Sequence, residues 1–291
     1  MDVIEILEKV GNEKIYIYPF GNHGKHLYQE IKLIAPKKEV IPVDNFLSKY
    51  SGGNVISGKD MKQKLKKEGI VLITSDNPAV YTEIRLSLID VPKEKIIDLF
   101  STNPLILSND RRVGALSAVA KRIYMDGIQG AVCEAGVYRG DFAKYINILF
   151  PDRKLYLFDT FEGFDKNSVD RTKDNSEETD SWIDLLNDTS VDYVMSRMRY
   201  PNKVIIKKGL FPDSADGMEE RFAFVNLDMD LYKPIYEGLI YFWDRLNIGG
   251  CIFVHDYTIW EGAKKAVKDF SSEKEIGYIL LNDNCTVAFT K

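Results

Sequence analysis

AVCEAGVYRG, at residues 131–140, is the stretch of the sequence that decides the fold. Its first three residues are apolar and predict a strand, which ends at Glu134. Gly136, Tyr138 and Gly140 then mark a tight turn, and apolar residues recur at helical spacing from residue 141 onward. A strand, a glycine turn and a helix in this order form a unit that holds a ligand. The glycines let the backbone approach it closely, and the helix start offers free amide groups.

The spacing of the turn, E-x-G-x-x-x-G, bears on the kind of ligand. The dinucleotide fingerprint is G-x-G-x-x-G, and this chain lacks its middle glycine. An acid at position 134 suits a ligand whose nearest group is cationic, such as the amino group of S-adenosylmethionine (SAM). The alternative is a purely structural turn in which Glu134 is solvated.

Composition and charge exclude several classes of protein. The 291 residues are 45% hydrophobic and 29% charged, which describes a folded chain long enough for two domains. The net charge is -5 with no block of consecutive basic residues, so we expect no nucleic-acid polymer as partner. No apolar run approaches the roughly 18 residues of a membrane span, and we expect no membrane association.

The N-terminal residues and the cysteines indicate the cellular compartment. The first residues, MDVIEILEKVGNEK, contain acids and lack the basic start and long apolar run of a signal peptide. Cys133, Cys251 and Cys285 each lie inside an apolar, strand-like run, with no C-x-x-C pair. We interpret them as small core residues and expect a reducing, cytoplasmic location.

Residues 1–104 predict a first, smaller α/β domain, because strands at 14–18, 40–43, 70–74 and 96–99 alternate with helices. Alternation of this kind predicts a parallel sheet. The run GNHGK at residues 21–25 resembles the start of the Rossmann-like domain of sugar acyltransferases, which implies contact with a nucleotide sugar. A degenerate scaffold is the alternative. The polar segment at 101–104 contains a proline and predicts the boundary with a second domain, residues 105–291.

In the second domain, polar residues follow one predicted strand after another. Asp159 and Thr160 follow the strand at 154–158, and Asp159 lies 25 residues after Glu134, where a ribose is usually held. Lys208 and Gly209 end the next strand and would lie near an adenine. Because ligands of open α/β sheets bind outside the carboxyl ends of the strands, we expect the acids and the histidine there to converge on one rim. They are Glu134, Asp159, Asp228, Asp230, His255 and Asp256.

Two further segments of this domain matter for function. Residues 159–192 are rich in acids and poor in aliphatic residues, so they form either a mobile lid or a solvated surface segment. The chain closes with strands at 277–281 and 286–289, joined by a short turn that makes them antiparallel. Such a terminal hairpin on a parallel sheet distinguishes SAM-dependent methyltransferases from ordinary dinucleotide-binding domains.

With these motifs in place, residues 132–270 resemble the macrocin O-methyltransferase family, which methylates sugar hydroxyls. The resemblance includes E-x-G-V-Y-R-G, D-T-F-E-G-F, D-x-D-L-Y and the V-H-D-Y that follows the fifth strand. It implies a Rossmann-like class I methyltransferase sheet with a terminal antiparallel hairpin. It further implies SAM as cofactor, a divalent cation, and a sugar, glycoside or nucleotide-sugar acceptor.

The resemblance also implies roles for single residues. The predicted cofactor set is Glu134, Gly136, Tyr138, Gly140, Asp159, Thr160, Lys208, Gly209 and Asp228. The cation would be held by Asp228 and Asp256 together with His255, and Asp230 would act as base beside Asp256. Well-studied members have two consecutive acids where this chain has His255 and Asp256, and imidazole suits a transition metal better than Mg²⁺.

Two rival hypotheses stay open at this stage. One is an NAD-dependent sugar-modifying enzyme, favoured by two Rossmann-like halves. The other is a non-catalytic module that binds a nucleotide sugar through the first domain. The large polar insertion and the extra domain make a homo-oligomer a reasonable expectation.

A thermal-shift screen separates the two cofactor classes. We expect SAM or S-adenosylhomocysteine to raise the melting temperature of the full chain, because a ligand that binds only the folded state stabilises it. NAD is the matched control and should leave the melting temperature unchanged. Stabilisation by NAD, with none by SAM or S-adenosylhomocysteine, would reverse the assignment.

Overall fold

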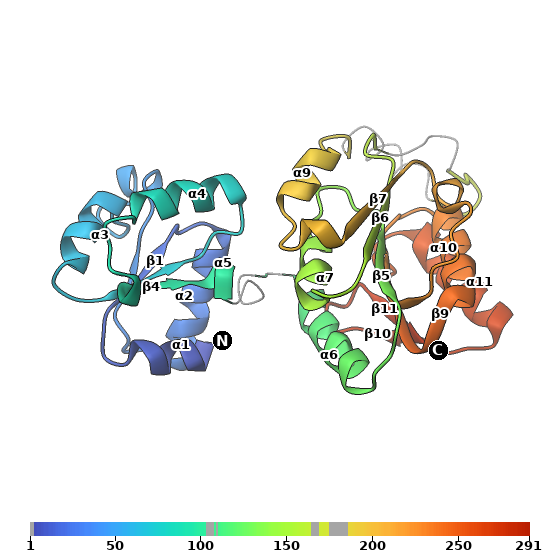
Figure 1. The fold of residues 1–291 in the computed structure, drawn as a ribbon, viewed down its shortest axis with the longest axis horizontal. Helices are drawn as coiled ribbons and strands as arrows, with labels where there is room; N and C mark the ends of the chain where they lie inside the picture. Colours follow the sequence, from blue (N-terminus) through green and yellow to red (C-terminus); the bar gives the residue numbers. More distant parts are fainter. Residues whose placement is uncertain (1–2, 103–107, 109, 164–168, 175–185) are drawn as a thin grey trace. The chain divides into compact units, whose positions relative to one another are not determined.

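A computed structural model describes residues 3–102, 108, 110–163, 169–174 and 186–291 of the chain. Two compact units divide it, residues 1–109 and residues 110–291, here called unit 1 and unit 2 (Figure 1). The predicted boundary between residues 104 and 105 lies outside the described residues and stays a prediction.

Unit 1 contains a four-stranded parallel sheet in the order β2-β1-β3-β4, which confirms the predicted alternation of strands and helices. Apolar residues of the strands and helices fill two clusters, one on each face of this sheet. The strands are β1 Ile15–Tyr18, β2 Val40–Pro42, β3 Ile70–Ile73 and β4 Ile96–Asp98. The helices are α1 Val3–Val10, α2 Asn22–Ile34, α3 Gly58–Leu65, α4 Pro78–Ser87 and α5 Leu99–Thr102.

Unit 2 is built on a seven-stranded sheet in the order β10-β11-β9-β8-β5-β6-β7. The five strands from β9 to β7 are mutually parallel, whereas β11 is antiparallel to both β9 and β10, which confirms the terminal hairpin. The strands are β5 Ala131–Ala135, β6 Leu155–Asp159, β7 Val204–Lys208, β8 Phe222–Leu227, β9 Leu246–Val254, β10 Ile279–Leu280 and β11 Val287–Thr290.

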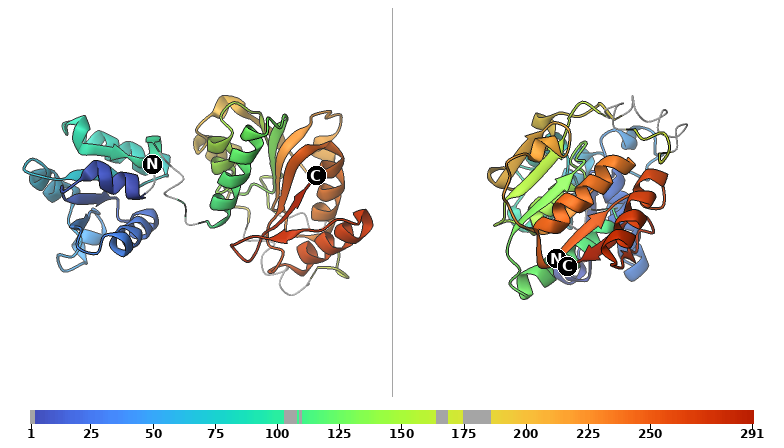
Figure 2. Two further views of the ribbon diagram at one scale, coloured as in Figure 1. Left: turned by 90° about the horizontal axis from the view of Figure 1, so that it is seen from below. Right: turned by 90° about the vertical axis from the view of Figure 1, so that its right-hand side faces the viewer.

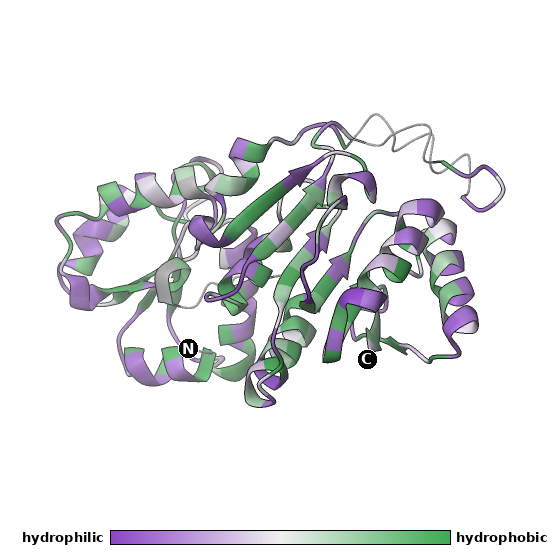
Figure 3. Ribbon diagram, turned by 45° about the vertical axis from the view of Figure 1, so that its right-hand side comes forward, coloured by the Kyte–Doolittle hydropathy of each residue, from purple (hydrophilic) through white to green (hydrophobic). Residues whose placement is uncertain are grey.

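Helices cover both faces of this sheet, as Figures 1 and 2 show for α6 and α7 on one side and α10 and α11 on the other. All residues of β5 and β8 are buried, as expected of central parallel strands covered on both faces. Figure 3 shows the hydrophobic colour along the strands and hydrophilic residues on the outward sides of the helices. The helices are α6 Arg112–Met125, α7 Ala143–Leu149, α9 Val191–Ser196, α10 Tyr232–Arg245 and α11 Glu261–Lys274.

Two outcomes differ from the predictions or lie beyond what the structure describes. The run N-I-G-G at residues 247–250 has the composition of a turn that ends a helix. In the structure it forms the irregular start of β9, where the register against β8 shifts. Nearly half of the acidic insertion at 159–192, namely residues 164–168 and 175–185, lies outside the described residues, so the choice between a lid and a surface segment stays open. No helix in the described ranges is long and apolar enough to cross a membrane.

An aromatic cluster between the sheet and α10 holds unit 2 together. Phe242 of α10 is fully buried, and its ring packs against the rings of Phe158, Phe211 and Phe222 with centroids 5.1–6.0 Å apart. Edge-to-face and offset contacts of this kind stabilise a core beyond the apolar area that they bury.

Truncation of this ring tests the description of the core. We expect Phe242→Ala to lower the free energy of unfolding of unit 2 by about 3–5 kcal/mol, because it removes buried area and leaves a cavity. All three tryptophans, residues 182, 243 and 260, belong to unit 2, so denaturant unfolding followed by tryptophan fluorescence reports this unit. Ile248→Ala, at a side chain that is 78% exposed, should leave the transition unchanged. Equal transitions for the two variants would contradict the description.

Candidate active site

A cavity of about 570 Å³ lies at the carboxyl edge of the sheet in unit 2. Its size is typical of a site for a cofactor or another small molecule. The six side chains predicted to converge on one rim all line it, and so do Gly136, Tyr138, Thr160 and Gly209. The convergence predicted from the strand ends is therefore present, while the functional roles of these residues stay predictions.

The glycine turn forms one wall and requires glycine at position 136. Gly136 has φ +83°, and a Cβ atom there would lie 2.0 Å from the carbonyl oxygen of Asp228. The turn therefore lies directly against the end of β8, closer than any side chain allows.

Asp159 holds the turn in place. Its Oδ2 accepts hydrogen bonds from the backbone N–H groups of Val137 (2.6 Å) and Tyr138 (2.8 Å), and its Oδ1 accepts one from Phe161 (2.7 Å). A carboxylate offers about four acceptor sites, so three are used within the protein. The predicted ribose contact of Asp159 must therefore use the remaining site or replace one of these bonds.

Glu134 fits a cationic ligand group. The side chain is buried, its Oε1 accepts a hydrogen bond from Asn226 Nδ2 (2.9 Å), and its Oε2 has no partner among the described residues. Burial, and then the charge of Asp228, raise the pKa of Glu134 well above its usual range. A buried acceptor without a partner is costly, and a ligand ammonium group would satisfy it. This residue thus meets the requirement that SAM would impose.

Asp228 lies between two basic side chains. Its Oδ2 accepts a hydrogen bond from Arg112 Nη1 (2.9 Å), and its Oδ1 lies 2.8 Å from His255 Nδ1. Burial alone would raise the pKa of Asp228, but His255 and Arg112 together hold it far below the usual range. In the reverse direction, burial would lower the pKa of His255, but Asp228 and Asp256 raise it to about 10. The cluster is therefore an ion-pair network at neutral pH.

Asp230 and Asp256 complete this rim. Both have positive φ, 61° and 57°, an uncommon conformation for residues other than glycine that often marks a functional site. Burial, and then the charges of Asp228 and Asp256, raise the pKa of Asp230 well above its usual range. Burial would also raise the pKa of Asp256, but the hydrogen bond and the charge of His255 lower it.

The donor atoms of this rim fit a cation in two overlapping ways. Carboxylate oxygens of Asp228, Asp230 and Asp256 lie within 4.8 Å of one another, a set suited to Mg²⁺. Donor atoms of His255, Asp256 and Cys285 also lie within 4.8 Å of one another. A cation bound to the first set would compete with Arg112 and His255 for Asp228, because each oxygen of Asp228 already has one of these basic partners.

Two predicted cofactor residues lie outside the lining of the cavity. Gly140 faces Val194 of α9, where a Cβ atom would come within 3.1 Å of a methyl group. Lys208 forms an ion pair with Glu162, Nζ to Oε1 2.8 Å. The glycine turn places Gly140 against α9, and the end of β7 directs the side chain of Lys208 toward Glu162. Neither residue therefore contacts the cavity.

Sequence reasoning missed one residue of the site, Arg112, and misjudged another, Cys285. Helical periodicity over residues 109–125 marks only the apolar positions as core and gives no role to Arg112, yet its guanidinium reaches Asp228 and lies 4.4 Å from the ring centroid of Phe142. A basic residue in the first turn of a helix is unfavourable against the helix dipole, and that signal could have marked it. Cys285 was predicted to be a core residue, but it lies half-buried in the turn before β11.

Unit 1 shows a different use of its predicted polar residues. Asp44 follows β2 at about the distance from the glycine turn where such folds place a ribose-binding acid. Its Oδ1 instead accepts hydrogen bonds from the backbone N–H groups of Phe46 and Leu47 at 2.9 Å each. His23 of the GNHGK run pairs with Asp76 after β3, Nε2 to Oδ1 2.9 Å. The resemblance of this unit to sugar acyltransferases stays a prediction.

Sheet order, terminal hairpin and cavity together define a class I SAM-dependent methyltransferase fold. The solved O-methyltransferase NovP superposes with a TM-score of 0.56 at 20% identity, over 62% of this chain and 79% of its own. The calicheamicin methyltransferase CalS11 superposes with a TM-score of 0.52 at 17% identity, over 72% of this chain and 90% of its own. These likenesses concern the fold.

The chain belongs to the macrocin O-methyltransferase (TylF) family, whose family model matches residues 101–291. One relative, from Streptomyces olivaceus, is the 8-demethyl-8-(2,3-dimethoxy-alpha-L-rhamnosyl)-tetracenomycin-C 4'-O-methyltransferase, 26% identical over 171 residues. Another, the mycinamicin III 3''-O-methyltransferase of Micromonospora griseorubida, is 29% identical over 174 residues. Each match covers 55% of this chain, and the chain spans 65% and 67% of the respective relatives. The predicted family resemblance is confirmed.

The ion-pair network predicts a pH dependence of stability in the metal-free protein. The pKa of His255 is raised from 6.5 to about 10, so its ion pairs contribute fully below pH 6.5 and are lost as the pH rises through 10. We expect the stability of unit 2 in the presence of a chelator to fall over this interval more steeply than that of His255→Asn. Denaturant unfolding followed by tryptophan fluorescence measures both, with His26→Asn in unit 1 as the control. Identical slopes for wild type and His255→Asn would contradict the network.

Proposed function

We propose that this protein is a SAM-dependent O-methyltransferase that methylates a hydroxyl group of a sugar or glycoside. The observation that carries the proposal is the cavity of unit 2, which places an unpaired buried oxygen of Glu134 and a cluster of three carboxylates on one edge of a methyltransferase sheet. Membership of the macrocin O-methyltransferase family supports the reaction class. The names of two relatives concern positions on glycosylated natural products, which supports the acceptor class.

Cofactor binding would use the glycine turn and the ends of β5 and β6. SAM, when bound, supplies a methyl group that its sulfonium already activates. Glu134 Oε2 would accept hydrogen bonds from the amino group, and Gly136 would let the backbone approach the ligand closely. Asp159 keeps the turn in the required shape and has one acceptor site left for a ribose hydroxyl.

Proton removal from the acceptor would be the task of Asp230. A sugar hydroxyl is a very weak acid, so its proton must leave as the new carbon–oxygen bond forms. Burial and neighbouring charges raise the pKa of Asp230, which makes its carboxylate a stronger base than an ordinary aspartate. Asp256, whose pKa is lowered, stays ionised beside it. Arg112 and His255 hold Asp228 in position at the back of the rim.

A divalent cation is part of the proposal as well. Asp228 and Asp256, with His255, are the residues that we propose to hold it, and it would stabilise negative charge on the acceptor oxygen. The carboxylates and the imidazole of this rim provide suitable donor atoms. The homo-oligomeric state and the cytoplasmic location stay predictions.

Replacement of Asp230 tests the catalytic assignment. We expect Asp230→Asn to lower kcat by at least about 10²-fold, because it removes the general base, while the Kd of SAM changes little. Methyl transfer from labelled SAM to a panel of glycosides and nucleotide sugars measures the first quantity, and calorimetry measures the second. Asp126→Asn, a surface change after α6, is the matched control and should retain both values. Unchanged turnover in Asp230→Asn would remove this residue from the mechanism.

A further inference from the structure

Cys285 is held in a fixed position beside the candidate active site. It lies in the turn between β10 and β11, where Asp283 Oδ1 accepts hydrogen bonds from the backbone N–H groups of Cys285 (3.1 Å) and Thr286 (3.0 Å). Its carbonyl oxygen accepts a further hydrogen bond from the N–H of Tyr257 (2.9 Å). The turn therefore presents the thiol to the segment that follows β9.

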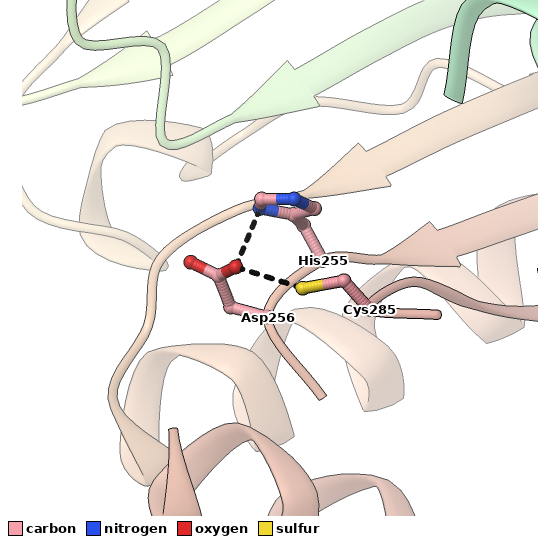
Figure 4. Close-up of side chains that lie close together, drawn as sticks. All are labelled: His255, Asp256 and Cys285. Carbon is pink, nitrogen blue, oxygen red and sulfur yellow. Dashed lines mark hydrogen bonds and ion pairs between the residues drawn. The ribbon is translucent and has the colours of Figure 1, made fainter. Parts of the chain in front are cut away.

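Two hydrogen-bond donors meet at a single oxygen in this cluster, as Figure 4 shows. The thiol of Cys285 donates to Asp256 Oδ1, with Sγ and Oδ1 3.1 Å apart. His255 Nδ1 lies 3.1 Å from the same Oδ1. Nitrogen, oxygen and sulfur donors, each on a different residue, thus converge on one point at the edge of the cavity.

The spacing of these atoms is close to that of a metal coordination sphere. Zinc binds sulfur at about 2.3 Å and nitrogen or oxygen at about 2.0–2.2 Å, so ligand atoms on one tetrahedral ion lie roughly 3.3–3.8 Å apart. The observed separations of 3.1 Å require only a small expansion. Asp228, whose Oδ1 lies 2.8 Å from His255 Nδ1, does not belong to this set of mutually close donor atoms. Three protein ligands therefore leave the fourth position of a tetrahedral ion to water or the acceptor.

The donor set selects the class of metal. Mg²⁺ prefers oxygen ligands and keeps much of its water, whereas thiolate and imidazole together favour zinc and similar transition metals. A bound ion would take the place of the two protons that Cys285 and His255 now direct at Asp256, because metal ligands must be deprotonated. The network of hydrogen bonds would thereby be replaced by bonds to the ion.

We propose that His255, Asp256 and Cys285 form a binding site for a thiophilic divalent transition metal such as Zn²⁺. The inference deepens the proposed function, on which its role in methyl transfer rests, because it assigns the cation of this site and adds a ligand from the C-terminal hairpin. The binding site itself does not depend on the identity of the acceptor.

Cobalt substitution tests the site directly. The full chain is stripped with a chelator and titrated with Co²⁺, and we expect a thiolate-to-cobalt charge-transfer band in the near ultraviolet. The band should be absent from Cys285→Ser, and the affinity for Co²⁺ should fall at least about 10-fold. Cys251→Ala, at a buried cysteine of β9 outside the cluster, is the matched control and should keep the band. Zn²⁺ should displace Co²⁺, and a hundredfold excess of Mg²⁺ should not.

Protection of the wild-type thiol gives a second measurement that needs no variant. Alkylation of Cys285, followed by mass spectrometry, should slow at least 10-fold when Zn²⁺ is present and should not slow with Mg²⁺. Absence of a charge-transfer band, its persistence in Cys285→Ser, displacement by Mg²⁺ or unprotected alkylation would each overturn the proposal. If no acceptor is methylated while the band forms, the proposed function fails and the metal site stands. If Mg²⁺ alone supports methyl transfer and no band forms, the function stands and the metal site fails.

Discussion

Asp228 connects four elements of unit 2, and the candidate active site depends on these connections. Its N–H donates to Ala135 O of β5 at 2.8 Å, and its carbonyl oxygen lies where a side chain of residue 136 would otherwise be. Its carboxylate holds Arg112 of α6 on one oxygen and His255, after β9, on the other. Removal of one partner from such a buried cluster leaves an uncompensated charge, so the members depend on one another. The glycine turn and the ion-pair network are thus two parts of one arrangement.

The sequence was sufficient for those features that depend on periodicity and on strand ends. Buried apolar runs predicted the strands, and acids directly after them predicted a common rim, since parallel strands bring their carboxyl ends to one edge. The same reasoning could not reach Arg112, because helical periodicity assigns a residue to a face and says nothing about how far a long side chain extends. It could not show that Asp159 binds the backbone of the turn, since spacing places a carboxylate without fixing its partners. The short run N-I-G-G at residues 247–250 carries turn signals that strand pairing overrode.

The two units differ in how they use the same local motif. Both begin a parallel sheet with a strand, a glycine turn and a helix, but the polar residues after the strands of unit 1 bind other parts of the same unit. Asp44 accepts backbone hydrogen bonds, and His23 pairs with Asp76. Nδ1 of His23 has no partner among the described residues, and in unit 2 the same holds for one carboxylate oxygen of Glu134, which faces the cavity. A buried acceptor that the protein leaves unsatisfied is a stronger indication of a ligand than the glycine motif itself.

The order in which the chain is synthesised gives a further meaning to the position of β11. This strand lies between β9 and β10, and its register with β9 supports the segment that carries His255 and Asp256. Residues 285–290 leave the ribosome after every other described part of unit 2 apart from Lys291. A nascent chain can therefore complete the central parallel strands while the strand that pairs with β9 is still missing. The cysteine that we propose as a metal ligand thus joins His255 and Asp256 only after the rest of their surroundings has been made.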